Sequence, residues 1–555
     1  MNNNKDKNYT SGVKRYFLNF RYQINSLSRR KQSSILSASI VLAITFGLSA
    51  ILGFLRSRFL YGRFFACCVS DLDAYTAAFR LPDLIFKLLV TGALSASFIP
   101  VFSNYIHKKD KETAYKISST VINLLLILFI FASVFVLIFT RQLSELITNN
   151  FTGHQLDLMV NLTRILMIAQ IFFLISNFLT GILQVHQTFI IPALSPIIYN
   201  VFIILSIFTL TPVFGIYGAA IGAVVGAFFH LAIQIPVARR RGFKYYFSIN
   251  PRLSGVKEII RLMIPRSLSL GLGEIENTVT LFFASSLVPG SISILNLALQ
   301  LMYMPSRIFG TTVGQASLPM LSKNIAQNEL ETFRKTVNRI ILQSVYIALP
   351  VTILILINRV SIVRIAFGAK NFPWEATLLT AKTLAFLTPA IISQAVIQIL
   401  IRSFYALHNT KTPLKVSIIS LIINVVLGYY FVNFTNMGIV GLAISASVGN
   451  MAQLFGLMYF FIKTVDGFSW NETLVRFNKI ALSAAFMGAT SWLGLIFLDR
   501  FIFDTSKTFY LIILFLINSF LGLASYIVSS HVLHIEEYRD YERFLAKFSR
   551  FIFTK

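Results

Sequence analysis

A chain of 555 residues would form several domains if it were soluble, but 55% of its residues are hydrophobic and only 13% are charged. With a mean hydropathy of +0.71, this composition is typical of a polytopic membrane protein and excludes a soluble globular class. The formal charge of +27 raises nucleic acid as a partner, so the placement of Lys and Arg has to decide. The only cysteines, Cys67 and Cys68, are adjacent, which excludes a disulfide framework and offers no metal-site spacing.

Hydropathy predicts fourteen membrane spans, each near the roughly 20 residues that a bilayer requires. In chain order they are 36–57, 74–103, 117–140, 158–184, 190–211, 216–238, 262–288, 292–318, 340–358, 376–405, 414–434, 438–462, 480–498 and 508–531. The first apolar run is too long for a signal peptide, so we interpret it as an uncleaved span. Outside these spans, and with both tails included, 32 Lys and Arg fall on one side and 8 on the other. The positive-inside rule therefore predicts cytoplasmic termini and no nucleic-acid partner.

An internal repeat divides the chain. IYGAAIGAVVG at 216–226 matches IVGLAISASVG at 439–449, and PDLIF at 82–86 matches PSRIF at 305–309, both at an offset of 223. Six spans per repeat is an even number, which predicts two lobes related by an axis along the membrane normal. The predicted parts are a basic cytoplasmic tail at 1–35, an N-lobe at 36–238, a cytoplasmic linker at 239–261, a C-lobe at 262–463, spans 13 and 14 at 464–531, and a cytoplasmic tail at 532–555.

The second predicted span carries charges where charges are costly. If it is helical, Asp73, Arg80 and Lys87 recur every seven residues and share one face. At 1.5 Å per residue, Arg80 and Lys87 lie about 10 and 20 Å along the axis from Asp73, so the three cannot all reach one interface. Asp83 could pair with either cation along the helix. The alternative is that Asp73 sits at the N-terminus of this helix as its cap, and that Arg80 and Lys87 snorkel to an interface.

Three further spans carry polar faces with steps of three or four residues. They are Thr45, Ser49, Gly53 and Arg56 in span 1, Ser269, Gly273, Glu276 and Thr280 in span 7, and Asn296, Gln300, Tyr303, Arg307 and Thr311 in span 8. This pattern predicts a hydrated cavity lined by spans 1, 2, 7 and 8. Among its charges, five cations against four acids leave a surplus of one, which suits an anionic substrate if the acids pair among themselves. The cations are Arg56, Arg80, Lys87, Arg266 and Arg307, and the acids are Asp73, Asp83, Glu274 and Glu276.

The runs LGFLR, SDLDAYTAAFRLPDLIF, GALSASFIPVFSNY and FYALHNTKTPLKVSIISLIIN closely resemble the MviN/MurJ family of lipid II flippases in the MATE-like superfamily. The resemblance covers most of the chain from about Ser49 to Gln453. It implies two six-helix lobes that open alternately to each side, cavity cations that hold the lipid's pyrophosphate, and two C-terminal spans that line a groove for the polyprenyl tail. It also implies membrane lipids and the cell-wall synthesis machinery as partners.

The resemblance also implies the substrate-binding residues, which we expect to be Arg56, Asp73, Arg80, Lys87, Gln300 and Arg307. Arg56 and Asp73 match important family positions, whereas Ala50, Phe86 and Gln300 stand where family members often have arginine. Lys87 beside Phe86, and Arg307 two turns beyond Gln300, are expected to supply the missing charge, although lysine lacks the fork of arginine. Thr280 and Gly428 fall where a sodium site would need carboxylates, so no metal or cofactor is predicted.

The leading hypothesis is a flippase of the bacterial inner membrane. It would move undecaprenyl-diphosphate-linked peptidoglycan precursor from the cytoplasmic to the outer leaflet by alternating access, without covalent chemistry. The alternatives are an exporter of another polysaccharide-lipid or of drugs in the same superfamily, and a membrane enzyme. An enzyme is disfavoured because the seven histidines show no acid–histidine pairing and no Gly-rich phosphate loop precedes a lysine.

Overall fold

The computed structural model describes residues 35–91, 94–108, 110–368, 372–465, 467 and 470–542. Within these residues the chain forms helices and connecting segments, and no strand. The predicted all-α class is therefore confirmed. Nearly all of the predicted N-terminal tail, and residues 543–555 of the C-terminal tail, lie outside the described residues.

Ten helices in the described part of the chain are long and apolar enough to cross a membrane, and they coincide with predicted spans 3 to 6 and 9 to 14. Helices also occupy spans 1, 2, 7 and 8, but these are not among the ten. Spans 2 and 8 are divided into shorter helices, and span 7 carries Glu274 and Glu276 near its middle. The count of fourteen stays a prediction, and the four exceptions are the spans for which polar faces were predicted.

The described residues separate into two compact units. Unit 1 takes its residues from 1–60, 74–146 and 152–274, and unit 2 from 61–73, 147–151 and 275–555. Four helices contribute residues to both units, namely α2 (Ile35–Phe64), α3 (Val69–Ala78), α7 (Thr140–Ile147) and α13 (Ser254–Ser285). The boundary within α13 assigns the first half of predicted span 7 to unit 1.

Unit 1 is built around α8, which packs against α4, α6, α11 and α12. The most apolar stretch of α8 is 56% buried, more than that of any other spanning helix in the unit, as expected for a central helix. Helix α9 packs along α11. The helices of unit 1 are α4 (Arg80–Phe86), α5 (Ile99–His107), α6 (Lys111–Ile138), α7 (Thr140–Ile147, whose last residue falls in unit 2), α8 (Gly153–Val185), α9 (Ile190–Thr209), α10 (Thr211–Phe214), α11 (Ile216–Ala232) and α12 (Gln234–Arg240).

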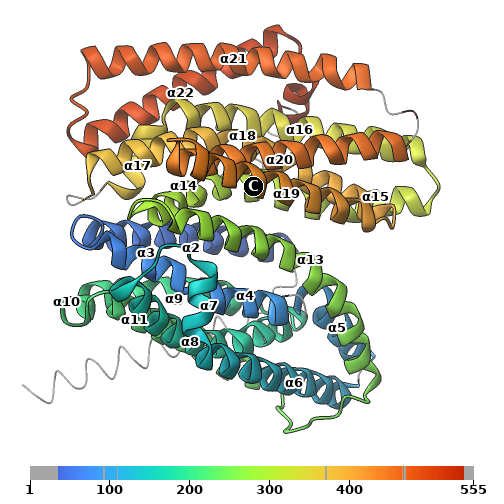
Figure 1. The fold of residues 1–555 in the computed structure, drawn as a ribbon. Helices are drawn as coiled ribbons and strands as arrows, with labels where there is room; N and C mark the ends of the chain where they lie inside the picture. The colour runs from blue at the N-terminus through green and yellow to red at the C-terminus, as the bar shows by residue number, and fades with distance from the viewer. Residues whose placement is uncertain are drawn as a thin grey trace, which may run out of the picture. The chain divides into compact units, whose positions relative to one another are not determined.

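Unit 2 is built in the same way around α18, which packs against α14, α15, α16 and α20 (Figure 1). The most apolar stretch of α18 is 61% buried. Helices α21 and α22 pack on each other, and Ile480, Met487 and Tyr526 join the hydrophobic core of α16 and α18. The helices of unit 2 are α14 (Ser291–Ser306), α15 (Val313–Ala326), α16 (Leu330–Ile357), α17 (Arg359–Phe367), α18 (Trp374–Ala406), α19 (Lys411–Phe434), α20 (Gly438–Thr464), α21 (Trp470–Phe501) and α22 (Thr508–Val532).

The internal repeat is visible in the backbone of the two units. The central helices α8 and α18 both have 33 residues and begin 221 residues apart (374 minus 153). Gly215 before α11 and Gly438 before α20, 223 residues apart (438 minus 215), have φ angles of 56° and 51°. A left-handed residue at the same turn in both halves explains why glycine recurs there. The order of helices around each centre supports the duplication inferred from sequence.

Both divided spans contain π-helical segments. They lie at Lys87–Thr91 and Leu94–Phe98 in span 2 and at Arg307–Thr312 in span 8, shortly after the equivalent prolines Pro82 and Pro305. A proline disturbs the hydrogen bonds of the turn before it, so the prolines do not account for widened turns that follow them. Because π-helical turns occur frequently at functional sites, they direct attention to Lys87 and Arg307.

Candidate substrate site

Two predicted cations converge on one carboxylate inside unit 1. The Nζ atom of Lys87 lies 2.9 Å from Oε1 of Glu274, and Nη1 of Arg80 lies 3.6 Å from Oε2 of the same residue. The spacing of seven residues placed both cations on one face, as the sequence predicted. The Glu274 side chain is 9% exposed, whereas those of Arg80 and Lys87 are 26% and 41% exposed. A buried acid thus holds two cations that remain accessible to a ligand.

The acid that pairs with these cations was not identified from sequence. Both ion pairs go to Glu274 of α13 rather than to Asp83. Asp83 instead accepts a hydrogen bond of 2.9 Å from Nε2 of Gln170 in α8. Sequence reasoning placed Glu276 on the polar face of span 7, and two residues along a helix point in different directions. Glu276 in fact accepts a hydrogen bond of 2.9 Å from Asn424 inside unit 2. Only packing could select between the two acids.

Arg56 of α2 belongs to the same unit as Arg80 and Lys87 and is half-buried. Helix α9 is attached to the polar face of α2 by Asn200, whose Nδ2 donates to the carbonyl oxygen of Ser49 at 3.3 Å. Ser49 lies seven residues before Arg56, which places both on one face of α2.

Asp73 has a different environment, at the beginning of α14 in unit 2. Its carboxylate accepts hydrogen bonds from the backbone N–H groups of Gly290 and Ser293, at 2.6 and 2.8 Å, and from the Ser293 hydroxyl at 2.6 Å. Gly290 is the N-cap of α14 and has no side chain with which to cap it. Asp73 supplies the missing acceptor and places a negative charge at the positive end of the helix. The structure differs from the alternative interpretation, in which Asp73 caps its own helix, because Asp73 lies within α3 and caps α14 instead.

Substituting Asp73 should therefore affect stability. Asp73→Ala is expected to lower the free energy of unfolding by about 0.5–2 kcal/mol, because it removes the cap of α14. The measurement is thermal unfolding of the purified protein in detergent. Asp110→Ala is the matched control, since Asp110 caps α6 through the N–H of Thr113 but is exposed to solvent, so its loss should lie at the low end of that range. An unchanged unfolding midpoint with lost transport would instead assign Asp73 to the substrate.

The remaining predicted residues, Gln300 and Arg307, belong to unit 2. Gln300 is half-buried on α14, and Arg307 is exposed where the π-helical segment begins, with its guanidinium 6.0 Å from the centre of the Tyr303 ring. The structure therefore assigns Arg56, Arg80 and Lys87 to one unit and Asp73, Gln300 and Arg307 to the other. The side chains of Arg266 and Ser269, also on the predicted polar faces, lie outside the described residues.

A large cavity in unit 2 is less suitable for an anionic headgroup. It has a volume of about 780 Å³ and is lined by four cations and four acids, namely Arg334, Lys335, Arg339, Arg476, Glu331, Glu472, Glu536 and Asp540. Equal numbers of opposite charges, most of them paired with each other, leave no surplus to attract a phosphate. The smaller cluster around Glu274 is the better candidate.

Comparison with known proteins decides the family. The family model described as "Lipid II flippase MurJ" matches residues 64–515. This chain belongs to the MurJ lipid II flippase family. The probable lipid II flippase MurJ of Bdellovibrio bacteriovorus is 27% identical over 466 residues, which cover 83% of this chain and 88% of that protein. The lipid II flippase MurJ of Burkholderia cenocepacia is 24% identical over 410 residues, which cover 72% and 79%. The resemblance inferred from sequence is confirmed.

Solved structures show the same fold. A lipid II flippase MurJ in an inward closed conformation matches with a TM-score of 0.73 at 24% identity, over 90% of this chain and 99% of that one. An inward-facing multidrug resistance transporter of the MATE family matches with a TM-score of 0.60 at 16% identity, over 77% and 98%. The MurJ family member described here is therefore a multi-pass helical membrane protein with a transporter fold.

Proposed function

We propose that this MurJ family member translocates lipid II, the lipid-linked peptidoglycan precursor, from the cytoplasmic to the outer leaflet of the bacterial inner membrane. Family membership supports the substrate class. The observation that carries the proposal is the pair of accessible cations, Arg80 and Lys87, held by buried Glu274 within a membrane protein. A diphosphate headgroup cannot cross about 30 Å of hydrocarbon unaided, so a hydrated cationic site is what the task requires.

Glu274 explains how such a site persists without substrate. Two cations left unpaired in a partly dehydrated region would be costly, and the carboxylate lowers that cost. With Arg56 and Asp83 included, three cations face two acids, which leaves a surplus of one. We infer that the diphosphate binds Lys87, Arg80 and Arg56 in competition with Glu274. The competition limits affinity, so the headgroup is released once it reaches the opposite leaflet.

The same proposal extends to parts of the chain that the comparisons leave open. We expect both termini in the cytoplasm, a second anion contact at Arg307 with Gln300 on α14, and a role for α21 and α22 in holding the polyprenyl tail. Lipid translocation needs no covalent step, and the family is one of flippases rather than enzymes. Contact with the cell-wall synthesis machinery would follow from the substrate and remains part of the proposal.

Depletion of the protein in its own bacterium tests the substrate. Lipid II is expected to accumulate in the inner leaflet, as measured by its inaccessibility to an external lipid II-cleaving enzyme in intact spheroplasts, and a plasmid copy should restore access. The Lys87→Gln copy should restore access only weakly. If another lipid-linked polysaccharide accumulates while lipid II reaches the outer leaflet normally, the protein is an exporter of that lipid instead.

A further inference from the structure

The linker after α12 is attached to a membrane-spanning helix along its length. Residues 243–250 form neither helix nor strand, and the N–H of Tyr246 donates to Oγ of Ser119 in α6 at 3.0 Å. Further along, Nδ2 of Asn123 donates to the carbonyl oxygen of Ser248 at 2.9 Å. Thr120 adds a bond of 3.2 Å to the Ser248 hydroxyl. Polar side chains of α6 therefore replace water as partners of the linker.

The position of these partners sets the depth of the linker. Asn123 lies six residues after Ile117, where the predicted span begins, which is about 9 Å along the helix axis at 1.5 Å per residue. Ser119 and Thr120 are fully buried and Asn123 is 5% exposed, directly before the long apolar run of α6. Irregular backbone is tolerated at membrane depth only where protein groups satisfy its hydrogen bonds. This arrangement meets that requirement.

Phe247 and Ile249 form an exposed apolar face on the segment. They lie next to the bonded residues Tyr246 and Ser248 and are 90% and 50% exposed. Tyr245 is 54% exposed, but its hydroxyl donates to Oδ1 of Asn123, so this ring is held against α6. Two large apolar side chains this close together would be unfavourable in water.

Basic residues surround this apolar face. Exposed cations at 239–261 include Arg239, Lys244, Arg252 and Lys257, whereas Glu258 is the only acid in that range. Aromatic side chains next to Lys and Arg are typical of segments that lie in the boundary between headgroups and acyl chains. The charge is complementary to an anionic leaflet, where each basic residue contributes about 1 kcal/mol.

We propose that residues 243–252 form an interfacial anchor that docks on the anionic lipids of the cytoplasmic leaflet. Phe247 and Ile249 enter the boundary between headgroups and acyl chains, and Lys244 and Arg252 contact anionic headgroups. The linker expected to be cytoplasmic thus lies in the membrane surface at this segment. The anchor is separate from the candidate substrate site and does not depend on the substrate.

The test uses the full-length protein with Cys67→Ser and Cys68→Ser, and a single labelling site at Phe247→Cys. An environment-sensitive fluorophore is attached, and the protein is placed in vesicles of phosphatidylcholine with phosphatidylglycerol or of phosphatidylcholine alone. We expect quenching by nitroxide-bearing lipids and protection from iodide in the anionic vesicles. Gln327→Cys, on an exposed loop after α15, is the control and should be quenched by iodide only.

Neutralising the flanking cations tests the charge. Lys244→Gln with Arg252→Gln should shift the ratio of lipid to iodide quenching by roughly fivefold per residue toward iodide, the equivalent of about 1 kcal/mol each. Equal lipid quenching in both kinds of vesicle would overturn the role of anionic lipids. Protection that depends on protein concentration instead of lipid would point to a second copy of the chain and overturn the anchor. Ile249→Cys gives the same readout if Phe247→Cys fails to fold.

Discussion

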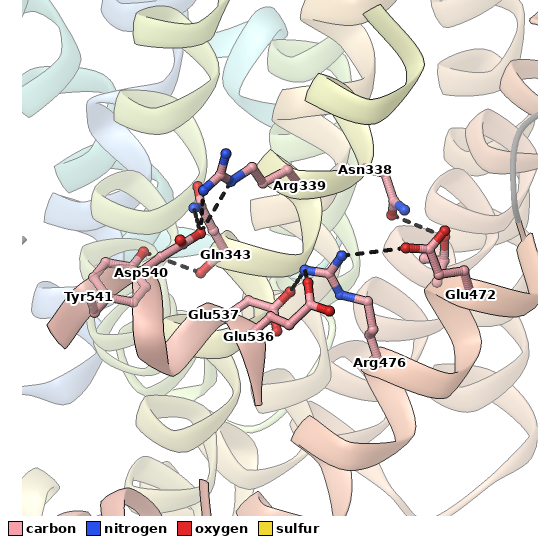
Figure 2. Close-up of polar contacts among 10 residues, drawn as sticks. Asn338, Arg339, Gln343, Glu472, Arg476, Glu536, Glu537, Asp540 and Tyr541 are labelled. Atoms are coloured by element: carbon pink, nitrogen blue, oxygen red, sulfur yellow. Dashed lines mark hydrogen bonds and ion pairs between the residues drawn. The ribbon is translucent and has the colours of Figure 1, made fainter. Parts of the chain in front are cut away.

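Arg476→Ala is expected to lower the free energy of unfolding by about 3–5 kcal/mol, because it leaves a buried carboxylate without its cation. Figure 2 shows Arg476 of α21 beside Glu536 and Glu537, which belong to the helical segment 536–542 after α22. Arg476 is paired with Glu537, which is 1% exposed, and lies 3.1 Å from Glu536. Without the guanidinium, the Glu537 charge stays desolvated.

Thermal unfolding in detergent measures this effect, and the chain offers a matched control. Arg339 of α16 contacts Asp540 of the same segment at 2.6 Å, but its side chain is 60% exposed, so Arg339→Ala should cost no more than about 1 kcal/mol (Figure 2). Combining Arg476→Met with Glu537→Leu should recover most of the loss, since no unpaired charge remains. Equal effects of Arg476→Ala and Arg339→Ala would contradict the assignment of a buried pair.

Packing of the segment 536–542 explains why the ion pair is buried there. Tyr541 stacks on Tyr346 of α16 with ring centres 5.8 Å apart, and Ile535 is 2% exposed in the same core. Burial raises the pKa of Tyr541 to about 12, so the ring remains neutral at physiological pH. The segment therefore fastens the N-terminal parts of α16 and α21 by both apolar and charged contacts.

Lys87→Gln is expected to weaken binding of lipid II ten- to hundredfold, because one charge-assisted hydrogen bond to phosphate contributes about 1.5–3 kcal/mol. The side chain of Lys87 is more exposed than that of Arg80, the other cation held by Glu274, so Lys87 is the more accessible of the two to the headgroup. The measurement is binding of purified lipid II to the protein in nanodiscs. Lys116→Gln is the control, since Lys116 is an exposed lysine that pairs with Glu112 one turn away.

Glu274→Gln should act in the opposite direction. Removing the competing carboxylate frees two cations, so lipid II should bind about tenfold more tightly, while transport slows because release is impaired. Affinity and transport would then change in opposite senses, which a purely structural role would not produce. If both Lys87→Gln and Glu274→Gln leave binding unchanged and only lower stability, the cluster holds helices together and the headgroup binds elsewhere.

Features of the chain that depend on local periodicity were accessible from sequence. Composition and hydropathy were sufficient for the membrane class, because about 20 apolar residues in a row have few alternatives to a spanning helix. The repeat at an offset of 223 led to the equivalent turns at Gly215 and Gly438. The spacing of Arg80 and Lys87 placed them on one face because helical geometry depends only on neighbours along the chain.

Partner choice between distant helices required the tertiary structure. Glu274 is 187 residues from Lys87, and Gly290 is 217 residues from Asp73, so no periodicity links either pair. Which acid meets which cation, and which helix end an aspartate caps, depends on how helices pack and rotate. The same holds for Asn123, whose polar side chain in an apolar helix has a purpose only once the linker lies against it. Desolvation makes each of these contacts specific, because a buried polar group without its partner is costly.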